Sequence, residues 1–91
     1  MKLKVFVIYD AKVEAYLQPF FNRTSGEAIR NFTDLANDSQ SQVYKHPEDF
    51  FLYEIAEYDQ SSGEFENLDK PHSHGPAIEY VRKQPELVKE S

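Results

Sequence analysis

Apolar and polar positions divide the chain into four extended segments and one helix. Residues 2–9 (KLKVFVIY) place apolar side chains on both faces of an extended chain, which predicts a central strand or one covered on both sides. A short polar turn at 10–12 leads to a second predicted strand over 13–20. Two more strands, over 50–58 (FFLYEIAEY) and more thinly over 64–68 (EFENL), form a predicted hairpin.

The segment between these strand pairs has the spacing of an amphipathic helix. Thr24 and Glu27 match a capping box, in which each side chain accepts a hydrogen bond from the other residue's backbone N–H. The polar run at 37–41 ends the pattern. The apolar positions in between are three and four residues apart and form one stripe: Ala28, Ile29, Phe32, Leu35 and Ala36.

Together these elements predict an α+β fold, with an antiparallel sheet of three to four strands and the helix Thr24–Asn37 packed on one face. The expected order is β-β-α-β-β, followed by a short helical segment after Pro76. Val43 and Tyr44 are expected to be extended, and 71–76 to be a rigid loop. Residues 1–84 then form a single domain, and 85–91 a flexible tail.

Composition narrows the classes of function. The chain of 91 residues has no cysteine, which excludes disulfides, thiolate zinc sites and cysteine catalysis. The net charge of −6 is unevenly divided, with +1 over residues 1–45 and −7 over 46–91. Nucleic-acid affinity arises mainly from Lys and Arg contacts to phosphates, so an acidic chain is a poor DNA coat. The acidic half is expected to face water or a basic protein partner.

No apolar run approaches the roughly 20 residues of a membrane span. Asp10 and Lys12 interrupt any signal-peptide core near the N-terminus. We therefore expect no membrane association and a location in the cytoplasm.

One candidate site lies at the predicted helix start. A helix N-terminus favours phosphate, and Gly26 permits close approach of an anion. The competing interpretation is an ordinary capped helix, because the Glu27 carboxylate already occupies the free N–H donors. Aromatic residues could stack bases, although most occupy core positions, with Tyr16, Tyr44 and Tyr58 expected to be exposed. The residues proposed for nucleic-acid or anion binding are Lys2, Lys4, Arg23, Thr24, Ser25, Gly26 and Arg30.

The histidines form the only metal-like pattern. His72 and His74, with His46 as a third nitrogen, have spacing that can chelate zinc or manganese on a strand. A similar histidine pair with a nearby tyrosine, here Tyr80, occurs in replication nickases. A loop built from Pro71 and Gly75 does not hold ligands rigidly, so no metal and no cofactor are predicted.

Catalytic patterns are missing from the sequence. Glu54 and Glu57 are expected on opposite faces of a strand, where they cannot act as an acid–base pair. The chain has no glycine-rich phosphate loop, nucleophile elbow or zincin motif. We therefore expect a protein that is not an enzyme.

A family resemblance adds to this interpretation, and the segments that carry it are 2–10, 14–17, 19–21, 28–34, 45–49 (KHPED) and 52–55. The chain resembles the small non-structural protein of gokushoviruses, which are single-stranded-DNA bacteriophages of the microvirus group. The resemblance covers residues 1–60 well and 61–91 loosely, and 45–49 is its most specific part.

The resemblance implies a phage-encoded protein that acts in the infected bacterium, without assigned catalytic residues. The leading hypothesis is a non-enzymatic accessory factor in genome replication or packaging, which binds host or phage replication or assembly proteins. The first alternative is a modest single-stranded-DNA binder that uses Lys2, Lys4, Arg23 and Arg30, and the second is a virion assembly component. Exposed edges at the second and fourth strands also predict a homodimer.

Overall fold

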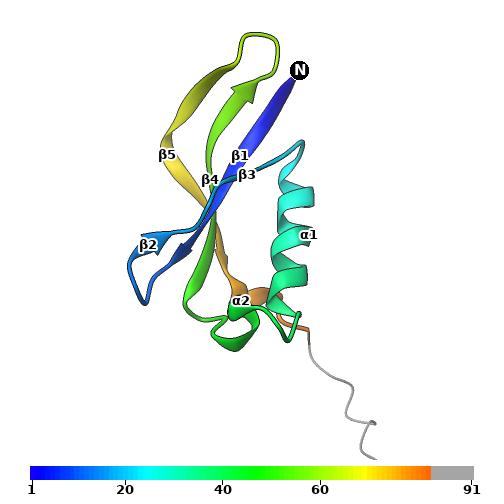
Figure 1. The fold of residues 1–91 in the computed structure, drawn as a ribbon, viewed down its shortest axis with the longest axis vertical. Coiled ribbons are helices and arrows are strands. Elements are labelled where there is room, and N and C mark those ends of the chain that lie inside the picture. Colours follow the sequence, from blue (N-terminus) through cyan, green and yellow to red (C-terminus); the bar gives the residue numbers. More distant parts are fainter. Residues whose placement is uncertain (83–91) are drawn as a thin grey trace, which may run out of the picture.

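The computed structural model describes residues 1–82 and has the predicted α+β architecture, an antiparallel sheet with one main helix across one face (Figure 1). The sheet has five strands: β1 (Lys2–Asp10), β2 (Ala15–Tyr16), β3 (Phe20–Asn22), β4 (Phe50–Asp59) and β5 (Glu64–Pro76). The helices are α1 (Ser25–Ala36), α2 (Gln42–Lys45) and the 3₁₀ helix η1 (Ala77–Tyr80). No helix in these 82 residues combines the length and apolarity that a membrane crossing needs.

The sheet order is β2-β1-β4-β5, and β3 pairs with β1 on the same side as β2. The single strand predicted over 13–20 is therefore wrong, because that region is divided into two short strands. Glu14 adopts a left-handed backbone conformation (φ 58°), so Val13 belongs to the turn and β2 begins only at Ala15. Pro19 has no N–H to donate, and it lies between the two pieces.

The predicted helix Thr24–Asn37 is confirmed as α1, with these two residues as its caps. The Glu27 N–H donates to the Thr24 hydroxyl at 3.1 Å. The Glu27 carboxylate accepts from the Arg23 N–H at 2.9 Å, one residue earlier than the capping box predicts. At the other end, the Asn37 side-chain amide donates to the Tyr80 carbonyl at 3.1 Å and so connects α1 to η1.

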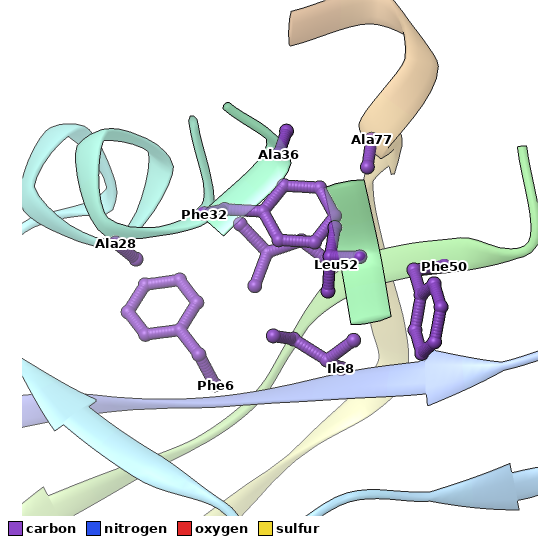
Figure 2. Close-up of a cluster of buried hydrophobic side chains, with 9 residues drawn as sticks. Phe6, Ile8, Ala28, Phe32, Ala36, Phe50, Leu52 and Ala77 are labelled. Carbon is purple, nitrogen blue, oxygen red and sulfur yellow. The ribbon is translucent and has the colours of Figure 1, made fainter. Parts of the chain in front are cut away.

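The core lies between α1 and one face of the sheet (Figure 2). Phe6 and Ile8 of β1 and Leu52 of β4 point toward the helix, which contributes Phe32 as its largest buried side chain. Smaller residues at the remaining contacts allow the helix to approach closely. The buried cluster is Phe6, Ile8, Ala28, Phe32, Ala36, Val43, Phe50, Leu52 and Ala77.

An irregularity in β4 changes which face each of its later residues occupies. Phe6 pairs with Glu54, whereas Val5 pairs with Ala56, so Ile55 is an extra residue in the ladder. Because of this bulge, Glu57 pairs with Lys4 and lies on the same face as Glu54. The prediction that Glu54 and Glu57 lie on opposite faces is therefore wrong, because it assumed an uninterrupted alternation.

Two smaller predictions also need correction. Val43 and Tyr44 belong to α2, because the Ser41 hydroxyl accepts from both backbone N–H groups and starts a helical turn. The segment 71–76, predicted as a loop, forms the second half of β5 and pairs with β4. The helical segment after Pro76 is confirmed as η1, although only Ala77 of it is buried. The predicted tail 85–91 and the last residues of the predicted domain lie outside the described residues.

Candidate functional site

Within residues 1–82, helix α1 lies over one face of the sheet and no helix lies over the other (Figure 1). Phe6 and Ile8 face α1, so the alternating residues Val5, Val7 and Tyr9 point to the opposite face. No helix of the described chain lies over that face, which we call the open face (Figure 1). Val5 and Val7 at the centre of the open face are buried, whereas several aromatic rings around them are accessible to another molecule.

Aromatic rings form two clusters on the open face. At the end near the β4–β5 turn, Phe21, Tyr58 and Phe65 have ring centroids 4.8–6.1 Å apart. At the other end, the ring centroid of Tyr9 lies 4.7 Å from that of Tyr16 and 6.5 Å from that of Tyr53. Between them is a shallow pocket of about 390 Å³ without charged residues in its lining: Val7, Tyr16, Leu17, Pro19, Ile55 and Pro71.

Three of these rings are exposed to solvent, whereas a sheet face that met only water would carry mainly polar side chains. Tyr16 is 62 % exposed, Phe65 58 % and Phe21 44 %. Contiguous exposed apolar patches beyond a few hundred Å² are uncommon in monomers and mark binding surfaces. The open face thus has the chemistry of a site covered by a protein or by stacked bases.

The predicted lysines lie on the other side of the sheet. Lys4 faces α1, where its ammonium group is 3.1 Å from the Glu54 carboxylate. Lys2 is 3.9 Å from the Glu57 carboxylate. Both lysines are therefore ion-paired, which leaves less positive charge for a nucleic-acid backbone.

The helix N-terminus is arranged as an ordinary cap. Hydrogen bonds from the backbone N–H of Arg23, together with its guanidinium 3.5 Å away, hold the pKa of Glu27 below its usual value. The Ser25 hydroxyl donates to Glu54 at 3.4 Å, and Gly26 has ordinary packing space around it. A carboxylate therefore already occupies the position where the sequence suggested an anion.

Two of the predicted basic residues do meet at one hollow. Arg23 and Arg30 line a space of about 570 Å³ beside the end of β3. Arg30 has no ion pair within residues 1–82. The other lining residues are Met1, Leu3, Phe21, Asn22, Glu27, Asn31 and Gln60. The structure thus separates the arginines from Lys4, which the sequence grouped with them.

The three histidines do not converge. His46 caps α2, and its ligand atoms lie within 4.8 Å of those of Glu48 and Asp49, on an exposed turn. His72 and His74 share one face of β5, with ring centroids 4.7 Å apart. Among the described residues, no group of three ligands includes both of them.

His74 is the unusual member of this set. Its ring lies 6.1 Å from that of Phe6, and the buried Nε2 has no hydrogen-bond partner within the described chain. The nearest carboxylate oxygen, on Glu54, is 4.0 Å away. Burial lowers the pKa of His74, and the neighbouring His72 and Lys4 act in the same direction, whereas Glu54 opposes them.

The lowered pKa of His74 predicts acid-sensitive stability. In the unfolded chain the His74 imidazole binds a proton with a pKa of about 6.5, whereas in the folded chain it does so only at lower pH. The unfolded state is therefore favoured by protonation, and the stability of the fold decreases as the pH falls below about 6.5. We expect the free energy of unfolding, measured by urea titration, to fall from pH 7.5 to pH 5 more in the wild type than in His74→Phe. Equal losses in the two proteins would show that His74 does not contribute.

Comparison with known proteins places the chain in a family. The family model described as phage ORF5 protein matches residues 3–80. The chain belongs to the phage ORF5 protein family. Searches of curated proteins and of solved structures found no match. Membership in this family confirms that the chain is a phage protein.

For this phage ORF5 protein, sequence reasoning found part of the open face. Tyr16, Tyr44 and Tyr58 were expected to be exposed. Tyr16 of the open face and Tyr44 of α2 are, at 62 % and 46 %, whereas Tyr58 is half-buried. Phe21 and Phe65 are also exposed, at 44 % and 58 %, although the sequence analysis did not single them out. The apolar character of both faces of residues 2–9 predicted burial on both sides, and Val5 and Val7 of the open face are indeed buried, with 3 % and 4 % of their surface exposed.

Proposed function

We propose that this phage ORF5 protein is a non-enzymatic accessory factor in viral genome replication or packaging, which works through a protein partner in the cytoplasm of the infected bacterium. The family assignment supports a phage role. The resemblance of residues 1–60 to the gokushovirus non-structural protein supports a role within a single-stranded-DNA phage. The partner is a phage or host replication or assembly protein.

One observation carries the preference for a protein partner over DNA. The exposed rings of the open face have no lysine or arginine among the pocket residues between them, and Lys2 and Lys4 are ion-paired on the opposite face. Aromatic residues are enriched at protein interfaces, whose centres are depleted of charge. Single-strand binding instead combines stacked rings with a positively charged groove.

The proposal can be tested in infected cells by replacing exposed aromatic side chains of the open face with serine. Phe21→Ser with Phe65→Ser should reduce replicative-form or packaged DNA, measured by quantitative PCR, because partner contact is lost. Tyr44→Ser is the matched control, since its ring is similarly exposed but belongs to α2. Normal yields of both DNA forms with a folded double variant would contradict the proposal.

A second function is favoured by the hollow that contains Arg23, Arg30 and Phe21, because it combines cationic side chains with an exposed ring. On this alternative the protein binds single-stranded DNA modestly. Under the leading proposal, in contrast, we expect the dissociation constant for an unstructured oligonucleotide at 150 mM salt to exceed about 10 µM, near nonspecific binding. Submicromolar affinity in fluorescence anisotropy, lost in Arg23→Glu with Arg30→Glu, would establish the alternative instead. Detection of the protein in purified virions would indicate an assembly component.

A further inference from the structure

The outer edge of β5 is unpaired in the described chain. Its only strand partner is β4, which bonds to the inner edge. Near the turn, residues 64–67 pair regularly with β4 and end at the irregularity before His72. Gly63 at φ 76° makes the tight turn that starts this strand. A regular, unpaired edge is a template for another extended chain.

The two faces beside this edge differ in chemistry. On the side of α1, Glu64 and Glu66 pair with Asp59 and Glu57 across the ladder. These four carboxylates surround a hollow of about 380 Å³ in which the only cationic side chain is that of Lys2. On the open face, Phe65 lies against Tyr58 and Phe21. One edge thus presents an acidic face and an aromatic face.

The chain itself shows what such a pair of faces binds. On the inner side of the hairpin, β4 presents Glu57, Tyr58 and Asp59 in the same acid–aromatic alternation. The strand that pairs with them is the Lys2-Leu3-Lys4 end of β1, which alternates basic and apolar residues. Cross-strand pairs of opposite charge and of apolar side chains stabilise a ladder.

We propose that the outer edge of β5, at residues 64–68, binds an extended segment of a protein partner in which basic and apolar residues alternate. The basic side chains neutralise the carboxylate group of Glu57, Asp59, Glu64 and Glu66, and the apolar ones cover Phe65 and its neighbours. The backbone of the added strand bonds to the free edge. This inference rests on the proposed function, because it specifies the chemistry of the partner that covers the open face.

A second copy of the chain fits this edge poorly. Antiparallel pairing of two β5 edges centred on Phe65 would bring Glu64 of each copy opposite Glu66 of the other. Like charges opposite one another destabilise a ladder. The charges therefore favour a basic partner over self-association through this edge.

The test uses the full chain and an acetylated octapeptide that alternates lysine and valine. Nuclear magnetic resonance should show shifted amide signals at residues 64–68, and calorimetry should show binding that weakens as salt is added. Glu64→Gln with Glu66→Gln should weaken binding at least about tenfold, because two charge pairs are lost. Glu48→Gln with Glu79→Gln removes the same charge from exposed residues away from this edge and should leave affinity unchanged.

Two control peptides make the result specific. A peptide with four lysines followed by four valines has the same composition without alternation, and one alternating glutamate and valine has the opposite charge. Binding of either with equal affinity, or no binding of the alternating lysine peptide, would overturn the inference. Loss of phage DNA in the open-face variants alongside absent peptide binding would overturn this inference alone. Peptide binding by a chain whose open-face variants support normal infection would overturn only the proposed function.

Discussion

Replacing Phe32 with alanine should lower the free energy of unfolding by about 3–5 kcal/mol, as expected for a large side chain removed from a fixed core. The Phe32 ring is fully buried between α1 and the sheet, where it contacts Tyr80 of η1 with 5.8 Å between ring centroids. A chain of this size has little stability to spare. Urea titration at neutral pH measures the change.

Leu35→Ala provides the control for this prediction. Leu35 belongs to the same helix and the same predicted stripe, but it is 37 % exposed. Its replacement should therefore cost less than about 1.5 kcal/mol. Similar losses for the two variants would show that α1 does not pack on the sheet through Phe32.

Replacing Lys4 with methionine should cost about 1–3 kcal/mol, because it leaves the Glu54 carboxylate without its cation. The Glu54 side chain is only 10 % exposed, and its remaining donor is the Ser25 hydroxyl. The cost stays below that of a fully buried pair, since the Lys4 side chain is 35 % exposed and partly solvated.

The double variant Lys4→Met with Glu54→Gln distinguishes charge from packing. It removes both charges, so it should recover most of the stability that Lys4→Met loses. Urea titrations of the two single variants and the double variant complete the cycle. Additive losses would mean that Lys4 and Glu54 contribute independently and that the close approach of their side chains has no energetic role.

The sequence predicts those parts of the fold that depend on local signals. Thr24, Glu27 and the stripe through Phe32 specify α1 because caps and spacing act over a few residues. The apolar alternation likewise predicts β1 and β4. The bulge at Ile55 was not predictable, because it depends on pairing with a strand some 50 residues away.

The candidate sites follow the same division. In the sequence, Glu54 is one polar residue of a predicted strand, and nothing near it marks a site. Only the folded sheet brings its carboxylate beside Lys4 and His74. The loop predicted around His72 failed because Pro71 and Gly75 suggest irregular structure, whereas pairing with β4 continues past them. The open face required knowing that one helix covers one side, which depends on the whole topology.

The position of β1 between β4 and the short strands has a consequence for synthesis on the ribosome. β1 is made before the other strands, but its long partner β4 ends at Asp59, so Lys2 and Asp59 meet only after the 57 or so residues between them have been made. Pairing over such separations is slow. Until then Phe6 and Ile8 have only the short strands and α1 to contact, so the nascent chain exposes its core strand to chaperones or to other chains.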